Sequence, residues 1–204
     1  MHRNKLHWRK LSILILLIGF PAIAFSEQME IGNPNDPAEG NPQSITRAYA
    51  IPSHGLLELS VPTEWSEKRQ QPPGGLPPTI LFQPKSGNEF KFLITTLWQE
   101  DPNAGLDQPD RLRAAMEQMG TLLMRRTAVE TQLDLKEDTA GNLGYYFTLT
   151  DRAPKPGEFE YVTQGTFVVG DLLLSFTFLA HEKESTALKT GLDLLRNARH
   201  RKAA

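Results

Sequence analysis

No cysteine occurs among the 204 residues of the chain. This absence excludes disulfide bonds, thiolate nucleophiles, zinc–thiolate sites and iron–sulfur ligation together. It also excludes the lipid-modified cysteine that anchors bacterial lipoproteins directly after their signal sequence. The folded chain must therefore be stabilised by packing alone, which its length permits.

Local motifs for common chemistries are missing as well. The sequence has no Gly-x-Ser-x-Gly elbow, no Gly-x-Gly-x-x-Gly loop and no Walker loop. Three histidines follow the first 26 residues, His54, His181 and His200, and they lack the short spacing that is typical of metal sites. We therefore predict no catalytic residue, no cofactor and no metal site, although an enzyme of unrecognised type remains a third hypothesis.

The first 26 residues have the order of a secretory signal. Basic residues at 3, 5, 9 and 10 precede an apolar run over 11–20, and Pro21 and small residues follow. Cleavage can follow Ala24 or Ser26, and we favour Ser26, which makes Glu27 the first mature residue. The alternative is an uncleaved anchor, but even when extended to Phe25 the apolar run has only about 15 residues, fewer than the roughly 20 that a spanning helix needs. We predict a periplasmic or secreted protein without stable membrane insertion.

Removal of this signal makes the chain acidic. The whole chain has 22 Lys and Arg against 24 Asp and Glu, and four of the basic residues but no acidic residue lie in 1–26. The remainder therefore has 18 basic and 24 acidic residues, a net charge of −6. This balance is not typical of a nucleic-acid-binding protein, and it does not provide a polybasic surface for anionic lipid.

The mature chain divides into a lead-in and one domain. Residues 27–50 include three prolines and few apolar side chains up to Thr46, so we predict a flexible lead-in. It can be a plain spacer, or a tether that folds on a partner. Residues 51–204 are expected to form a single domain.

Hydrophobic periodicity predicts two main helices and a set of strands in this domain. Period-two alternation or flanking turns predict strands over 55–61, 79–83, 89–99, 129–136, 144–150, 160–169 and 172–181. Apolar residues spaced three and four apart predict helices over 107–126 and 183–200. Because most strands are joined as hairpins, we predict an α+β fold with a mostly antiparallel sheet of about six or seven strands.

Two groups of polar residues are candidates for chemistry. Asp101, Asn103 and Asp107 offer oxygens at every second or fourth position, but Gly105 and the missing glutamate do not fit an EF-hand loop. The other interpretation is a turn-rich loop in which Asp107 caps the helix and Pro109 begins it. Separately, Asp151, Glu158, Glu160 and Asp171 can in principle pair for acid–base work, although solvation at the surface is the ordinary role of such residues.

The strand over 56–61 is followed at once by Pro62-Thr63-Glu64-Trp65, then by a hairpin, a helix, four strands and a closing helix. This order resembles the PsbP-like superfamily, which includes a photosystem extrinsic subunit, a Ran-binding import factor and DcrB-type bacterial envelope proteins. The resemblance implies an α/β/α sandwich with a central antiparallel sheet, and non-enzymatic work on partner proteins. We also expect Trp65 to seal one end of the core rather than to bind a ligand.

From these observations we expect an exported, non-catalytic domain that binds or stabilises a protein partner in the bacterial cell envelope. The alternative is a periplasmic carrier of a small molecule or metal, with Asp101, Asn103 and Asp107 as its ligands.

Overall fold

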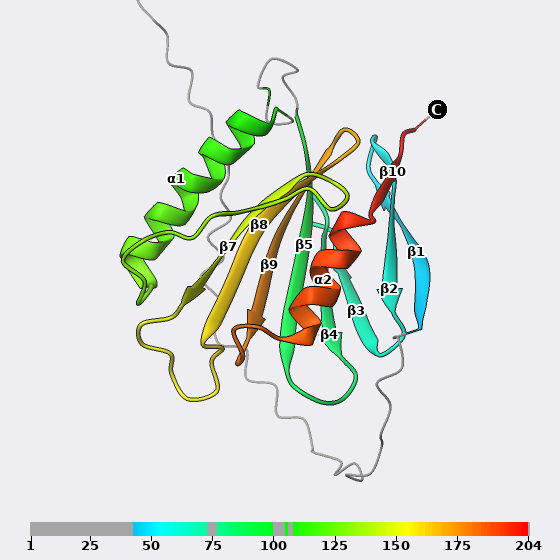
Figure 1. Cartoon of the computed structure of the whole chain (residues 1–204). Helices are drawn as coiled ribbons and strands as arrows, with labels where there is room; N and C mark the ends of the chain where they lie inside the picture. The colour runs from blue at the N-terminus through cyan, green and yellow to red at the C-terminus, as the bar shows by residue number, and fades with distance from the viewer. Residues whose placement is uncertain (1–42, 73–76, 100–104, 106–107, 204) are drawn as a thin grey trace, which may run out of the picture. The chain divides into compact units, whose positions relative to one another are not determined.

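The computed structural model describes residues 43–72, 77–99, 105 and 108–203 (Figure 1). Ten strands and two helices follow one another in this part of the chain. Their bounds are β1 Ser44–Ile51, β2 Gly55–Pro62, β3 Trp65–Gln70, β4 Thr79–Pro84, β5 Phe90–Trp98, α1 Pro109–Thr127, β6 Lys136–Asp138, β7 Gly144–Thr150, β8 Tyr161–Val169, β9 Leu172–Ala180, α2 Thr186–Arg196 and β10 Arg199–Arg201.

The strands form two antiparallel sheets. The main sheet has seven strands in the order β3-β4-β5-β9-β8-β7-β6, and the small sheet has three in the order β1-β2-β10. All neighbouring strands in both sheets are antiparallel. The α+β class, the mostly antiparallel sheet and the two helices are therefore confirmed.

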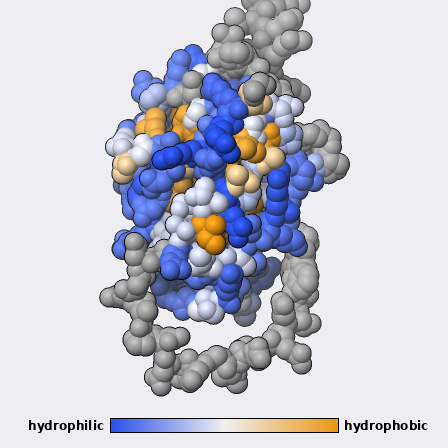
Figure 2. All heavy atoms as spheres, turned by 90° about the vertical axis from the view of Figure 1, so that its right-hand side faces the viewer, coloured by the Kyte–Doolittle hydropathy of each residue, from blue (hydrophilic) through white to orange (hydrophobic). Residues whose placement is uncertain are grey.

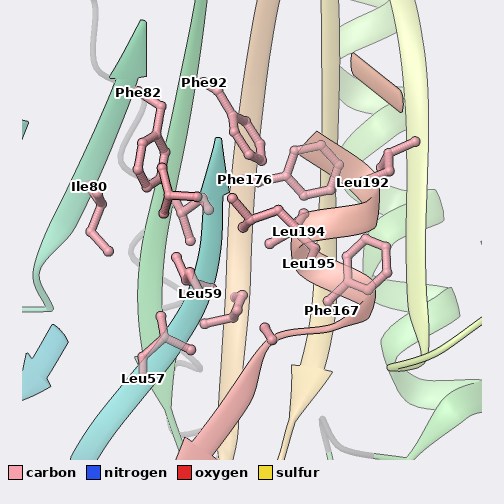
Figure 3. Packing of buried hydrophobic residues seen from close by; sticks show 14 of the residues in the cluster. Leu57, Leu59, Ile80, Phe82, Phe92, Phe167, Phe176, Leu192, Leu194 and Leu195 are labelled. Carbon is pink, nitrogen blue, oxygen red and sulfur yellow. The ribbon is translucent and has the colours of Figure 1, made fainter. Parts of the chain in front are cut away.

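The larger hydrophobic cluster lies between the main sheet, the small sheet and α2 (Figure 3). Alternate side chains of β4, β5, β8 and β9 supply its aromatic centre, and leucines of β2 and α2 complete it. Its fully buried members include Phe82, Phe92, Phe167, Phe178, Leu57, Leu59 and Leu195. Burial of this much apolar surface is the main favourable contribution to folding in a chain without disulfide bonds.

A second cluster forms where α1 lies beside β7 and β8 (Figure 1). Leu112, Met116 and Met124 of the helix contact Tyr145, Phe147 and Leu149 of β7. Successive side chains of a strand point to opposite faces, so Phe167 reaches the larger cluster while Val168 reaches this one. The two helices therefore use different faces of the main sheet. Gly120 permits the close approach of α1, because a Cβ there would lie 2.8 Å from Leu133 and 2.9 Å from Phe147.

The Pro62-x-x-Trp65 segment is the corner between the two sheets. Pro62 ends β2 in the small sheet, and Trp65 begins β3 in the main sheet. Trp65 is 7% exposed, and its ring lies 4.9 Å from that of Phe90 and about 6 Å from those of Phe82 and Phe92. The prediction that Trp65 belongs to the core is confirmed.

Side chains join the free edges of the two sheets at this corner. The Tyr49 hydroxyl of β1 donates to the Glu67 carboxylate of β3 at 2.5 Å, and the Arg69 guanidinium donates to the Ala50 carbonyl. Burial, followed by the hydrogen bond to Glu67, raises the pKa of Tyr49 above its usual value, so the hydroxyl keeps its proton. These contacts occupy part of the β1 edge, which would otherwise be open to pairing with another strand.

The boundary predicted for the lead-in is wrong at its C-terminal end. Residues 44–50 are part of β1, which pairs with β2 along its full length. Ile45, Tyr49 and Ile51 lie on the same side of this strand, and Tyr49 and Ile51 are buried in the larger cluster. Burial of these apolar side chains offsets the entropy cost of ordering the segment, and composition alone did not indicate it.

The strand predicted over 129–136 is also wrong, because only Lys136–Asp138 pairs, as β6. Glu130 explains the interruption. Its carboxylate accepts the Thr150 amide N–H at 2.9 Å and the Thr150 hydroxyl at 2.7 Å, so a side chain takes the donor that a neighbouring strand would use. Val129 is 58% exposed, while Leu133 and Leu135 pack against the α1 cluster without a strand partner.

Glu130 makes stability depend on pH in the acid range. Burial by itself would raise the pKa of this carboxyl, but hydrogen bonds from Thr150 and the charge of Lys183 hold the pKa below its usual value. The stabilisation is therefore present above the unfolded-state pKa of about 4.3 and is lost as the pH falls through the folded-state pKa. We expect Glu130→Ala to lower the free energy of unfolding by about 1–2 kcal/mol at pH 7, and by less below pH ~4.

Urea denaturation at neutral and acid pH measures this difference. The exposed Glu64, whose carboxylate has no ion pair within the described part of the chain, is the matched control. Glu64→Ala should change stability little at either pH. An equal loss for Glu130→Ala at both pH values would show that its carboxylate charge is not the cause.

Both predicted helices begin or end elsewhere than expected. The N-cap of α1 is Gln108, with Pro109 in the first turn, so the predicted capping position is wrong; Asp107 itself lies outside the described residues. The closing helix ends at Arg196 instead of His200, because Asn142 donates to the carbonyls of Leu195 and Ala198 and satisfies the helix end. Arg199–Arg201 then pairs with β2 as β10, so the basic tail is largely a strand.

Candidate functional site

In the described part of the chain, no helix packs extensively on one face of the main sheet across β3, β4, β5 and β9, and we call this the open face. Cross-strand partners share a face of a sheet, so the register identifies its members. Within the described residues, α1 packs on β7 and β8, and α2 and the small sheet lie on the other face. The open face consists of Ser66, Lys68, Gln70, Thr79, Leu81, Gln83, Lys91, Leu93, Thr95, Leu97, Leu173, Ser175, Thr177 and Leu179.

The open face is partly apolar and accessible. Leu81 and Leu93 are directly opposite each other on β4 and β5, and Leu179 is opposite Lys91. Apart from Leu173, every member of the face is half-buried or exposed. The opposite, buried face of the same strands carries Ile80, Phe82, Phe92, Ile94, Phe176 and Phe178, and four of these six side chains are aromatic.

Hydrogen bonds hold the polar side chains of this face in place. The hydroxyls of Thr79 and Thr95 lie 2.9 Å apart, and the Gln164 amide of β8 donates to the Thr177 hydroxyl at 3.1 Å. The Lys91 ammonium lies 5.5 Å from the centre of the Phe159 ring, within the range of a cation–π contact. The surface is therefore largely pre-ordered, which reduces the entropy cost of binding.

No Asp or Glu occurs among the fourteen members of the open face, whereas Lys68 and Lys91 do. The local charge is thus positive in a chain whose net charge is −2. A surface of this kind attracts acidic partners and repels basic ones.

The flank of α1 that faces away from β6 also carries apolar and cationic side chains. Arg113 forms an ion pair with Glu137 of β6 at 3.6 Å, so that side of the helix faces β6. Leu122 lies nine residues further on, on the opposite flank of the helix, and it lines the hollow on the outer side of α1. Leu122 is 43% exposed, and the exposed Arg125 and Arg126 follow it.

A second group of polar residues lies where four segments meet at one end of the sheets. The ring of His54 stacks on that of Trp98 at 4.3 Å. The Asp171 amide donates to His200 Nδ1 at 3.3 Å, and His200 Nε2 donates to the His54 carbonyl at 2.5 Å. These two bonds indicate the neutral imidazole with its proton on Nε2.

Asp171 in this group is already paired. Its carboxylate lies 2.6 Å from the Lys202 ammonium, and the hydrogen bond from Lys202 is the main cause that lowers the pKa of Asp171. The adjacent Gly170 has φ 59°, and a Cβ there would lie 3.0 Å from His200 Nδ1. Because these side chains bond to one another, we interpret the histidine group as a structural contact. It attaches β10 to the two turns that carry His54 and Asp171.

The other predicted candidates are not brought together. Asp101, Asn103 and Asp107 lie outside the described residues. His181 contacts the Phe159 ring instead of another histidine. Asp151 accepts the Ala153 amide, and Glu158 pairs with Lys155 in the loop before β8, whereas Asp171 follows β8 at its far end. In the described part of the chain, no three His, Asp or Glu side chains are grouped so that they could hold a metal ion.

Hollows on the described surface are small or open. One of about 150 Å³ lies at the start of α2, and its lining includes Phe90, His181 and Glu182. Another of about 480 Å³ lies on the outer side of α1, lined by Gln118 and Leu122 among others. Figure 2 shows that the side carrying the small sheet is mainly hydrophilic, with apolar colour confined to separate spots.

No protein-family model matches the chain, and no characterised protein matches its sequence. Neither α1 nor α2, the two helices of the described residues, is long and apolar enough to cross a membrane.

Proposed function

We propose that this chain is an exported, non-catalytic domain that binds a protein partner in the bacterial cell envelope, and that the open face is its contact surface. The observation that carries the proposal is the accessibility of Leu81, Leu93 and Leu179 on a sheet face on which no helix of the described residues packs extensively. Contiguous accessible apolar surface of this kind marks interaction sites in soluble proteins. The secretory pattern of residues 1–26 supports the location.

We also propose that the fold is the α/β/α sandwich of PsbP-like proteins. The contacts of α1 and α2 with different faces of the main sheet support this arrangement. The buried Trp65 at the corner between two sheets gives the Pro-x-x-Trp segment a structural reason. Binding of partner proteins by this family fits the proposed activity.

The dimensions of the hollows favour a protein ligand over a small molecule. Sites for small ligands are concave, of about 300–1,000 Å³, and enclose most of the ligand surface. The hollow near α2 is smaller, at about 150 Å³, and the larger one lies on the outer side of a single helix. The open face is instead a broad surface with ordered polar groups between leucines, which is typical of protein interfaces.

Matched substitutions at two accessible apolar positions test the proposal. Leu93 lies on the open face, and Ile45, which is 47% exposed, lies on β1 of the small sheet. We expect Leu93→Thr to reduce retention of envelope proteins by the exported chain about tenfold, and Ile45→Thr to leave it unchanged. Threonine suits a strand, so both variants should remain folded.

The measurement is quantitative mass spectrometry of proteins retained from a detergent extract of the envelope, with thermal melting of each variant beside it. Intact mass of the exported chain also reads its N-terminus, which we expect at Glu27. Equal retention by Leu93→Thr and the unaltered chain, with both folded, would overturn the open face as the contact surface.

A further inference from the structure

We infer that the partner bound by the open face presents an acidic segment, whose carboxylates pair with Lys68 and Lys91 and whose apolar side chains contact the leucines between them. This inference rests on the proposed function and adds the chemistry of the partner. It is carried by the distribution of charge on the open face and not by the apolar surface itself.

The lysines of this surface form no ion pair within the described residues, and Lys91 contacts only the uncharged Phe159 ring among the interactions described above. Neither Lys68 nor Lys91 lies within ion-pair distance of a carboxylate of the described residues, and the same holds for Arg126 on the α1 flank. Elsewhere, Arg113, Arg201 and Lys202 are each paired with an acidic side chain, whereas Lys136 and Lys189 form no ion pair within the described residues. The open face thus offers positive charge and has no acidic side chain among its fourteen members.

The lysines and leucines are interleaved on the face. Lys68 is directly opposite Leu81, which is opposite Leu93, and Lys91 is directly opposite Leu179. Neighbouring strands lie about 4.8 Å apart, so a cation and an apolar side chain occur within one strand spacing of each other. A partner segment that carries Asp or Glu together with apolar residues would pair with the lysines and contact the leucines at the same time. A purely apolar segment would instead leave the two lysines buried without a counter-charge.

An anionic membrane is a poorer match to the same surface. Membrane-surface binding relies on projecting aromatic or large apolar side chains together with a cluster of some four to eight basic residues. The fourteen members of the open face include no aromatic residue, two lysines, and seven Ser, Thr or Gln side chains. Its leucines are half-buried between these polar groups.

Carbodiimide coupling tests the inference because it joins a lysine to a carboxylate only where the two are in contact. The activated carboxylate forms an amide with Lys Nζ, and the carbodiimide takes up the oxygen that is lost and leaves as its urea. We expect the exported full chain, incubated with envelope extract, to yield a partner peptide joined at Asp or Glu to Lys68 or Lys91. Lys68→Arg/Lys91→Arg should retain the partner but lose this coupling, since arginine keeps the charge without the reactive amine.

Charge reversal completes the test. We expect Lys68→Glu/Lys91→Glu to retain at least about tenfold less partner, because like charges would then face each other. The control is Lys136→Glu/Lys189→Glu, which changes net charge equally at exposed positions on β6 and α2. It should retain the partner normally. Raising the salt concentration should weaken retention by the unaltered chain.

The outcomes separate the two proposals. Unchanged retention by Lys68→Glu/Lys91→Glu, with loss in Leu93→Thr, would overturn the acidic partner and leave the open face as the contact surface. No retention by the unaltered chain would contradict both. Binding to phosphatidylglycerol vesicles in place of any protein would also overturn both and assign the surface to the membrane.

Discussion

Trp65→Ala is expected to lower the free energy of unfolding by about 3–5 kcal/mol, the usual cost of removing a large aromatic from a core. The Trp65 ring is 7% exposed and lies beside the rings of Phe82, Phe90 and Phe92. It also occupies the first position of β3, where the chain passes from the small sheet to the main sheet. A cavity at this corner would weaken the packing of both sheets at once.

Urea denaturation followed by circular dichroism measures the loss. Trp98→Ala is the matched control, because Trp98 lies at the end of β5, is half-buried, and stacks on His54 at the edge of the core. It should cost clearly less than Trp65→Ala. Equal midpoints for Trp65→Ala and the unaltered protein would show that Trp65 does not anchor the core.

The second large effect is expected at the ion pair between Asp138 and Arg196. The Asp138 side chain is 4% exposed, and its oxygens accept from Arg196 Nε at 2.8 and 3.0 Å and from Nη2 at 2.6 Å. The hydrogen bonds to Asp138 are also the largest cause that raises the pKa of Arg196 above its usual value. Arg196→Met would leave the Asp138 carboxylate buried and unpaired, which we expect to cost about 3 kcal/mol.

Two further variants separate this effect from a general surface effect. Asp193, which is 62% exposed, contacts the same guanidinium, so Asp193→Asn should cost less than about 1 kcal/mol. Asp138→Asn/Arg196→Met should be more stable than Arg196→Met alone, because no unpaired charge remains. If the double variant is instead the least stable of the three, unpaired charge at Asp138 is not the cause.

The strands that the sequence predicted correctly are those whose signals are local. β8 and β9 have regular alternation and meet at Gly170-Asp171, and Gly170 has the positive φ expected for that turn. β4 and β5 are similarly bounded by turn residues. In such hairpins, the partner of a strand is its neighbour in the sequence, so periodicity and turn chemistry are sufficient.

The strands that the sequence did not predict depend on distant partners. β3 consists of Trp65 followed by five polar residues, and it is a strand because β4 pairs with it. β10 has only three residues and depends on β2, far earlier in the chain. Conversely, the alternation of residues 129–136 was misleading, because Glu130 provides the hydrogen bonds that a partner strand would provide.

The candidate site could be predicted only in part for the same reason. Alternation places Leu93 and Leu97 on the face of β5 opposite Phe92 and Ile94, but periodicity does not indicate whether a helix covers that face. In the described structure, α1 packs mainly on β7 and β8, and this position of the helix decides whether the face is covered. The His54–His200 contact joins residues 146 positions apart, and no local signal indicates it.

Site-specific photo-crosslinking tests most directly whether the open face binds a protein. Gln83 lies in the open face on β4, whereas Ala48 is an exposed residue on the outer side of the small sheet. With benzoylphenylalanine at either position of the exported chain, illumination of intact cells should give a discrete crosslinked protein from position 83 and none from position 48. Absence of a crosslink at position 83, or the same products from both positions, would contradict the proposed function.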